Sequence, residues 1–213
     1  MAFISEDDRP EVRKQLDGIE DPVTIHLFTE DDCQYCDETI ELNKELVALH
    51  DGLTLEQYDL RGETAEEWGA DKYDGGPVAL ISRDGNSNVR YYGIPSGHEF
   101  PSYLEDIVEV STGKADLDDG IVSELEEIDE EIDITVFVTP TCPHCPRAVS
   151  TAHSFAMAND KITGEMVESQ EFMELSQEYG VRSVPQINVN GDAAQFTGAL
   201  PPEQFLEQVK SAL

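Results

Sequence analysis

Two C-x-x-C motifs restrict what this 213-residue chain can fold into more than any other feature. All four cysteines of the chain lie in them, in the stretches DDCQYCDE and PTCPHCPR. Each motif follows a short β-rich run and a polar turn, in VTIHLFTEDDCQYC (23–36) and ITVFVTPTCPHC (134–145). A proline follows further downstream in both cases, in DGGPVALI (74–81) and RSVPQINV (182–189).

The two stretches repeat with a common period. Cys33 and Cys142 lie 109 residues apart, and Pro77 and Pro185 lie 108 residues apart. Because two independent landmarks agree within one residue, we predict a tandem duplication of a domain-sized unit. We place the units at residues 1–114 and 115–213, on either side of the polar stretch STGKADLDDG.

Each half shows the same order of predicted elements. An amphipathic helix precedes a strand, and a helix then begins at the C-x-x-C. A second strand, a polar helix, a strand after the proline, a hairpin turn and a closing helix follow. This alternation predicts an α/β fold with a mixed sheet covered by helices. Besides the C-x-x-C helices, we expect helices at 9–16, 63–71, 97–110, 117–128, 169–179 and 201–212, strands at 23–28, 53–58, 134–138 and 162–167, and hairpin turns at 84–86 and 190–192.

The charge balance excludes one class of partner. The chain has 46 acidic and 13 basic residues, a formal net charge of −33. Nucleic acid is therefore a poor partner, because binding its phosphates needs a basic face. The acids are dispersed along the chain, which is typical of a halophilic protein adapted to a salty cytoplasm, where screening removes most self-repulsion.

The N-terminal sequence MAFISEDDRP has neither the basic nor the apolar region of a secretory signal. No apolar run approaches the length of a membrane span, so we expect a cytoplasmic protein with no membrane partner. A reducing cytosol rarely keeps structural disulfides. The C-x-x-C motifs therefore indicate either metal binding or redox chemistry.

A C-x-x-C at a helix start favours the redox interpretation. Residues i and i+3 share a helix face, so the two sulfurs can close a small disulfide ring. The first cysteine faces unpaired backbone N–H groups and the positive end of the helix dipole, which favours its thiolate. That thiolate attacks a substrate disulfide, and the second cysteine resolves the mixed disulfide.

The second motif carries additional features. His144, when protonated, and Arg147 add positive charge that favours a thiolate. Pro143 suits the first helical position. Pro146 is expected to lie about one turn inside the helix and to bend or loosen it.

The two motifs differ in their charged neighbours. Carboxylates precede and follow the first motif, in TEDDCQYCDE, whereas none lies between Ile134 and Arg147. Because carboxylates oppose a nearby thiolate, we predict that Cys142 is the more reactive thiol.

A zinc site made of all four cysteines is the alternative to redox chemistry. Its usual pair spacing is about 15–20 residues, whereas Cys36 and Cys142 are 106 residues apart, so we expect no metal.

The motifs resemble a known family. YGVRSVPQI (179–187) resembles the cis-proline segment of thioredoxins and glutaredoxins, and VTPTCPHC resembles the glutaredoxin active-site turn. Two such units, with CQYC and then CPHC, resemble the archaeal glutaredoxin-like protein disulfide oxidoreductases, as do FISEDDR and RYYGIPSGHEF. The resemblance implies two tandem thioredoxin-like units.

The resemblance also implies roles for individual residues. Cys33 and Cys142 would attack, and Cys36 and Cys145 would resolve, through the redox-active disulfides Cys33-Cys36 and Cys142-Cys145 without another cofactor.

By the same resemblance, Pro77 and Pro185 would form cis peptide bonds beside the disulfides. The backbone of Gly76 and Val184 would pair with an extended protein substrate. Partners would be protein thiols and disulfides and a thioredoxin-reductase-like flavoprotein.

Two departures from the pattern leave questions open. The strands before the motifs lack the buried aspartate of thioredoxins, and His26 is interpreted as structural, so no proton acceptor is assigned. FTGALPP lacks the pattern of glutathione-using glutaredoxins, and His144 favours a more oxidising site.

The main hypothesis is an oxidoreductase acting on protein disulfides as reductase, oxidase or isomerase. The alternative is a dedicated carrier from a flavoprotein to a client such as a peroxiredoxin.

Overall fold

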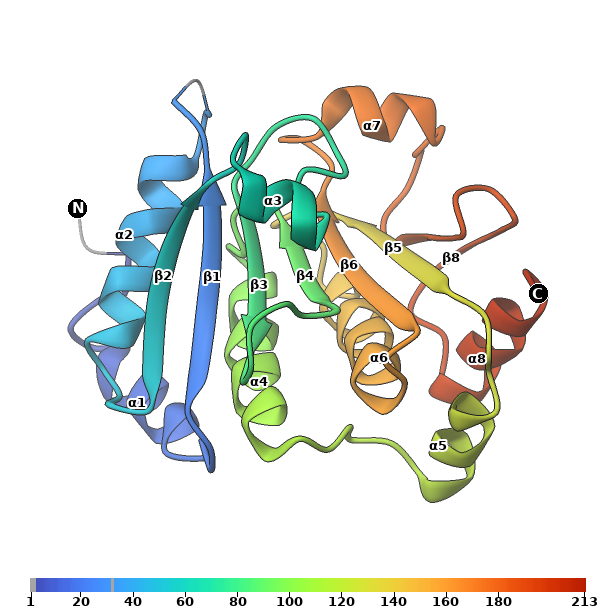
Figure 1. The fold of residues 1–213 in the computed structure, drawn as a ribbon, viewed down its shortest axis with the longest axis horizontal. Helices are drawn as coiled ribbons and strands as arrows, with labels where there is room; N and C mark the ends of the chain where they lie inside the picture. Colours follow the sequence, from blue (N-terminus) through green and yellow to red (C-terminus); the bar gives the residue numbers. More distant parts are fainter. Residues whose placement is uncertain (1–2, 32) are drawn as a thin grey trace.

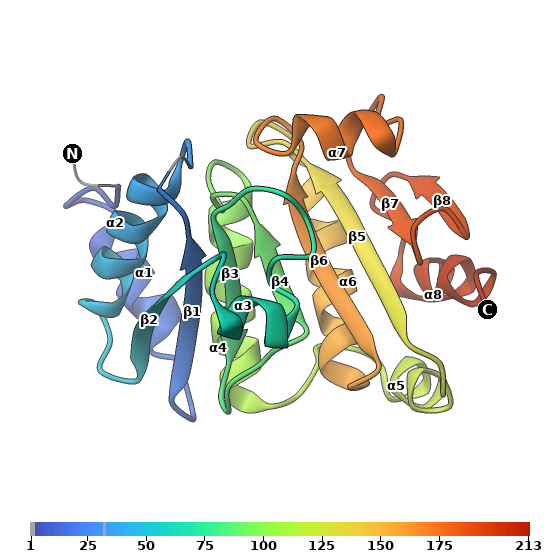
Figure 2. The same ribbon diagram turned by 45° about the horizontal axis from the view of Figure 1, so that its top comes forward.

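A computed structural model describes residues 3–31 and 33–213 (Figure 1; Figure 2 gives a second direction). The strands in this part of the chain are β1 (Val23–Thr29), β2 (Leu53–Asp59), β3 (Val78–Ser82), β4 (Val89–Tyr92), β5 (Ile132–Val138), β6 (Ile162–Glu168), β7 (Gln186–Val189) and β8 (Ala194–Thr197). They form one mixed sheet in the order β2-β1-β3-β4-β6-β5-β7-β8.

The helices cover both faces of this sheet. They are α1 (Arg9–Leu16), α2 (Cys36–Val47), α3 (Glu63–Trp68), α4 (Glu99–Thr112), α5 (Asp119–Glu126), α6 (Cys145–Ala158), α7 (Met173–Glu178) and α8 (Pro202–Lys210). Successive side chains of a strand point to opposite faces, which divides the buried apolar residues into two clusters. The larger cluster lies under α1, α2, α4, α5, α6 and α8, and the smaller lies under α3 and α7.

The two halves repeat one topology. In the first half, β1 pairs with β2 in parallel and with β3 antiparallel. In the second half, β5 pairs with β6 in parallel and with β7 antiparallel. A hairpin closes each half, β3–β4 and β7–β8. The predicted thioredoxin-like α/β fold is confirmed, and the helix that carries the cysteines follows the central strand of each half.

One strand pair joins the halves. β4 would be the edge of the first half, with unpaired backbone groups along one side. It pairs in parallel with β6, with Tyr91 opposite Met166 and Tyr92 opposite Val167. The halves therefore share one continuous sheet (Figure 2). The sequence predicted a sheet in each unit but not this pairing between them.

A buried charge cluster reinforces the junction. Lys72 of the first half lies 2.9 and 3.0 Å from the two carboxylate oxygens of Glu165 on β6. The hydroxyls of Tyr73 and Thr135 donate to the same carboxylate at 2.8 and 3.1 Å. Burial acts to lower the pKa of Lys72, but Glu165 and Asp133 outweigh it and the pKa is raised. The fully buried carboxylate of Glu165 is thus balanced by a cation from the other half.

Most predicted elements are present, with differences at their ends. The predicted helix at 117–128 is shorter, as α5. The predicted helix at 169–179 begins only at Met173, because the preceding residues form a turn in which the Glu168 carboxylate accepts the N–H groups of Gln170 and Glu171 at 2.9 and 2.7 Å. The unit boundary at 114/115 stays a prediction, and it falls between α4 and α5. Within the described ranges, every helix is too short or too polar to span a membrane.

We predict that Lys72→Met destabilises the protein by about 3–5 kcal/mol, because it leaves a buried carboxylate without its cation. Urea unfolding of both proteins measures this difference. Lys44→Met is the control, since Lys44 pairs with Glu41 at 2.9 Å on the exposed surface, where a pair contributes about 1 kcal/mol or less. Equal losses in the two variants would contradict a special role for the junction.

Candidate active site

Each C-x-x-C stands at the N-terminus of a helix. α2 begins at Cys36 and α6 begins at Cys145, so the first cysteine of each motif lies just before the first turn. The sulfurs of each motif are bonded to each other, at 2.00 Å for Cys33–Cys36 and 2.22 Å for Cys142–Cys145. The Cα atoms are 5.4 and 5.5 Å apart, within the usual range for a disulfide. The predicted small disulfide ring is therefore confirmed in each motif.

The second motif has a direct backbone donor. The Cys145 N–H points at the Cys142 sulfur, with nitrogen and sulfur 3.2 Å apart. This N–H is one of the groups that the helix cannot satisfy at its start. In the reduced protein it favours a thiolate at Cys142, as does the positive end of the α6 dipole.

The structure corrects the interpretation of the two prolines in CPHCPR. Pro143 lies in the turn before α6 and not at its first position. Pro146 lies in the first turn, where a backbone N–H has no acceptor within the helix. The predicted bend at Pro146 is therefore wrong, because Pro146 lies in the first turn of α6 and does not interrupt the helix.

Both downstream prolines are cis, as the resemblance implied. The Gly76–Pro77 and Val184–Pro185 bonds are the cis peptide bonds of the described residues. A Cβ built on Gly76 would lie 3.7 Å from the Cys36 sulfur, so the cis-proline loop contacts the first disulfide. Pro77 and Pro185 each directly precede a strand, β3 and β7. The substrate-binding roles of Gly76 and Val184 stay predictions.

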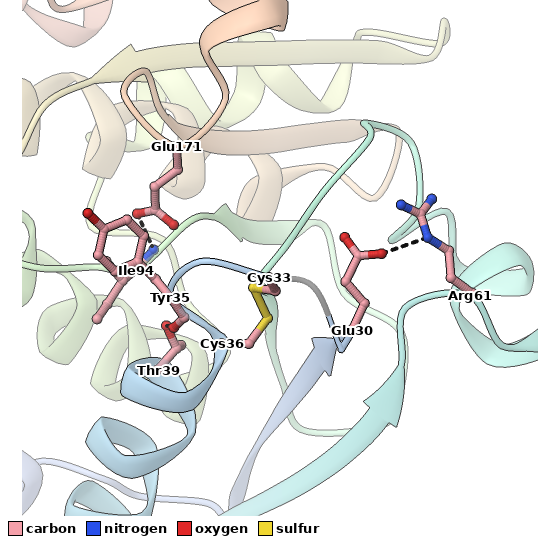
Figure 3. Close-up of a disulfide and its surroundings, with 8 residues drawn as sticks. All are labelled: Glu30, Cys33, Tyr35, Cys36, Thr39, Arg61, Ile94 and Glu171. Carbon is pink, nitrogen blue, oxygen red and sulfur yellow. Dashed lines mark hydrogen bonds and ion pairs between the residues drawn. A yellow bond between two sulfur atoms is a disulfide. The ribbon is translucent and has the colours of Figure 1, made fainter.

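The first site lies beside an acidic cleft. A cavity of about 760 Å³ borders the disulfide and is lined by Glu30, Asp31, Asp37, Asp59 and Arg61, among others. Arg61 is the cation of this group, and its Nε lies 2.8 Å from Glu30 (Figure 3). Glu30, Asp31 and Asp37, which the sequence placed next to the first motif, thus line the cavity that borders the disulfide, and Asp32 lies outside the described residues.

His144 and Arg147, which the sequence suggested as sources of positive charge at the second site, both have exposed side chains. His144 is exposed at the N-cap of α6 and makes no capping hydrogen bond through its side chain. Arg147 is exposed and lines a groove between α4 and α6 together with Lys114 and Glu109. Their influence on the thiolate stays a prediction.

Glu99, which sequence reasoning missed, is a buried carboxyl at the start of α4. It is only 2% exposed. Neither of its carboxylate oxygens has a hydrogen-bond partner among residues 3–31 and 33–213. Burial, and then the charge of Asp106, raises the pKa of Glu99 to about 8. The preceding His98 N–H donates to the Pro140 carbonyl at 3.0 Å, two residues before Cys142.

The contact between α4 and α6 shows where Glu99 lies along the helix axes relative to the second cysteine pair. The Asp106 carboxylate accepts a hydrogen bond from the Tyr91 hydroxyl and lies 2.6 Å from Nδ1 of His153. Asp106 is seven residues beyond Glu99, and His153 is eight residues beyond Cys145. Because each helical residue rises 1.5 Å, Glu99 is level with the second cysteine pair. Glu99 of the first half therefore lies at the level of the site of the second half.

His26 is structural, as interpreted. It is buried on β1, and its ring nitrogens lie 3.1 Å from the Tyr58 hydroxyl and 3.1 Å from the Ser82 hydroxyl. Burial lowers the pKa of His26, which favours the neutral ring. The His26 ring also packs against the aromatic rings of Tyr58 and Trp68.

The four cysteines do not converge on one point, because each pair is bonded within its own half. Among the residues that the structure describes, no group of three or more His, Cys, Asp and Glu side chains is placed to hold a metal ion. Two disulfides at helix starts, each with a cis-proline downstream, define a thiol–disulfide exchange protein of thioredoxin fold.

Comparison with known proteins agrees with this class. A thioredoxin-domain family model matches residues 132–211. The crystal structure of a protein disulfide oxidoreductase from Aeropyrum pernix k1 has 32% identity and a TM-score of 0.88, over 100% of this chain and 94% of that one. A structure of the alkylhydroperoxide reductase AhpF from Enterococcus faecalis (V583) has 25% identity and a TM-score of 0.87, over 98% of this chain and 100% of that one.

Longer relatives share the similarity. An NADH dehydrogenase of Bacillus subtilis (strain 168) is 24% identical over 172 residues, which are 80% of this chain and 32% of that protein. The alkyl hydroperoxide reductase AhpF of Pseudomonas aeruginosa is 24% identical over 202 residues, 94% of this chain and 36% of that protein. The chain thus spans about a third of the length of these two relatives. With its full-length match to the Aeropyrum protein, the chain belongs to the protein disulfide oxidoreductase family and is an enzyme of thiol–disulfide exchange.

The raised pKa of Glu99 has a consequence for stability. Between its ordinary value of 4.5 and about 8, the folded protein holds a proton on Glu99 that the unfolded chain has lost. The wild type therefore loses stability as pH rises through this interval. We predict that Glu99→Gln gains stability relative to the wild type by about 1.4 kcal/mol per pH unit there. Urea unfolding at pH 5 and pH 8 measures this, with exposed Glu63→Gln as the control, and a difference independent of pH would contradict it.

The unequal surroundings of the two sites predict unequal reactivity. In the reduced protein at low salt, iodoacetamide should modify Cys142 faster than Cys33 by roughly tenfold, equivalent to one pKa unit. At about 1 M salt the Debye length falls to about 3 Å, so the ratio should shrink. Mass spectrometry of the two cysteine peptides measures both rates. A faster Cys33 at low salt would reverse the ranking.

Proposed function

We propose that this chain exchanges disulfides with protein substrates through both C-x-x-C sites, and that Cys142–Cys145 is the more reactive pair. The observation that carries this proposal is the same arrangement in both halves, with a disulfide at a helix start and a cis-proline before a strand. A site used only for electron transfer to one client needs one such arrangement, and this chain has two.

The proposed cycle follows from the site chemistry. The Cys142 thiolate attacks a substrate disulfide and releases one substrate thiol, forming a mixed disulfide. Cys145 loses its proton, attacks the Cys142 sulfur and releases the second thiol. Two electrons and two protons pass from the enzyme dithiol to the substrate, and the enzyme disulfide remains. The reverse sequence oxidises a substrate dithiol, so the reduction potentials decide between reductase, oxidase and isomerase.

Recognition of the substrate would use the backbone beside each cis-proline. Gly76 and Val184 directly precede the cis-prolines, at the entry to β3 and β7. An extended polypeptide would pair with these backbone groups and bring its disulfide to the attacking sulfur. Because such pairing does not read side chains, it suits an enzyme that accepts several protein substrates.

Glu99 would serve the second site as proton acceptor. Its raised pKa is suited to general acid–base chemistry near neutral pH. It stands level with Cys145, whose proton must leave before the mixed disulfide can be resolved. In this proposal, Glu99 has the role for which the sequence named no residue.

In this proposal, a thioredoxin-reductase-like flavoprotein supplies the electrons. A cytoplasmic location in a salt-rich cell would suit the dispersed charge of −33. Both are parts of the proposal that rest on the charge and on the chemistry of the site.

The second candidate function is a dedicated carrier between a flavoprotein and a client such as a peroxiredoxin. The names of two relatives, NADH dehydrogenase and alkyl hydroperoxide reductase, favour it. Both are about two and a half times as long as this chain.

Reduction of insulin by dithiothreitol tests the proposal. We predict catalysis by the wild type, a loss of about tenfold or more in Cys142→Ser, and a smaller loss in Cys33→Ser. Cys145→Ser should trap protein substrates as mixed disulfides, which mass spectrometry identifies. A dedicated carrier would be slow with insulin and fast with one client. Activity that survives Cys142→Ser but disappears in Cys33→Ser would reverse the order of the two sites.

A further inference from the structure

A carboxyl of the second half reaches the first site. Glu171 lies in the turn between β6 and α7, and its Oε1 accepts the N–H of Ile94 at 2.9 Å. Ile94 follows β4 of the first half. A Cβ built on Gly93 would lie only 3.0 Å from the same oxygen. Glu171 therefore packs closely against the first half although it belongs to the second.

Two further contacts connect this position to the first disulfide. The Gly93 N–H donates to the carbonyl of cis-Pro77 at 2.8 Å. The residue before that proline, Gly76, lies against the Cys36 sulfur. Figure 3 shows Glu171 with Ile94 and Tyr35 on one side of the disulfide, and Glu30 with Arg61 on the other.

Glu30 and Glu171, the two carboxyls on either side of this disulfide, differ in their partners. Glu30 is engaged with Arg61 at 2.8 Å. Glu171 has no cation among its partners in the described residues, and its buried Oε2 has no hydrogen-bond partner there. Burial raises the pKa of Glu171 to about 7, against the effect of the Ile94 N–H.

Two other carboxyls act on Glu171 from different elements. Glu168 is the last residue of β6, three residues before Glu171, and Glu38 lies in the first turn of α2, two residues beyond Cys36. Both charges raise the pKa of Glu171. The influence of Glu38 indicates that Glu171 is within electrostatic reach of the helix start that carries the first cysteine pair.

We propose that Glu171 is the proton acceptor of the Cys33–Cys36 site, supplied by the other half of the molecule. The proposal rests on thiol–disulfide exchange at this site as proposed above. After the Cys33 thiolate has formed a mixed disulfide, the Glu171 carboxylate takes the proton of the Cys36 thiol. The Cys36 thiolate attacks the Cys33 sulfur and expels the substrate thiolate, which takes up a proton from the protonated carboxyl or from water. Protons and electrons balance, and Glu171 returns to its starting state.

A single-turnover reaction with dithiodipyridine separates the steps. The second site is removed by Cys142→Ser and Cys145→Ser, and the first is reduced. Attack by Cys33 releases one thiopyridone, and resolution by Cys36 releases the second. In Glu171→Gln the first release should keep its rate, and the second should slow by about 100-fold. In the parent, the second release should accelerate as pH rises through about 7, where Glu171 loses its proton. This rise should be absent from the variant.

Glu174→Gln is the matched control, because Glu174 is an exposed carboxyl three residues away in the same segment. It should change neither step. Gln at 171 can still accept the Ile94 N–H, and equal melting temperatures of variant and parent verify that the fold is retained. An unchanged second release and pH profile in Glu171→Gln would overturn the proposal, and so would equal slowing of both releases. A parent that releases only one thiopyridone would instead remove the proposed exchange function of this site, and with it any role for Glu171.

Discussion

The parallel pairing of β4 with β6 joins the two halves of the molecule directly through the backbone. It turns the edge of one thioredoxin-like unit into the interior of a continuous sheet, and so removes an exposed edge strand. The same pairing brings the turn after β6 against the segment after β4, and brings α4 beside α6. The buried Lys72–Glu165 pair lies at this junction. A tandem repeat has thereby become one structure whose two redox sites lie near the seam.

Each half contributes to the seam one carboxyl with a buried oxygen, which we propose serves the site of the opposite half. Glu99 of the first half stands level with Cys145, and Glu171 of the second half lies beside the first disulfide. Burial raises the pKa of both, to about 8 and about 7. Thioredoxins solve the same problem with an acid inside a single unit. The strands before the cysteines carry no buried carboxyl here. In our proposal the two halves supply such an acid to each other across the junction.

Much of the fold and the position of the cysteine pairs could be predicted from the sequence. The features that could not be predicted have a common physical cause. Local patterns predicted the duplication, the C-x-x-C at helix starts and the structural role of His26, because each depends on neighbours in the chain. The pairing of β4 with β6 depends on residues more than 70 positions apart, as in Arg90 opposite Glu165. Glu99 and Glu171 were two acids among 46, and only burial at the seam distinguishes them. Pro146 was misplaced for a smaller reason, since α6 begins at Cys145 and not at Cys142.

In the mechanism proposed above, each dithiol exchanges protons with a carboxyl of the other half. The pH dependence of the two reduction potentials, measured separately by mass spectrometry in thiol–disulfide buffers, is a test of this mechanism. A carboxyl that senses the sulfurs adds its own inflection near pH 7 to 8. The account predicts that Glu99→Gln removes this inflection only at Cys142–Cys145 and that Glu171→Gln removes it only at Cys33–Cys36. The mechanism would be contradicted if both inflections stayed in place in the two variants. It would also be contradicted if each substitution removed the inflection of the cysteine pair in its own half.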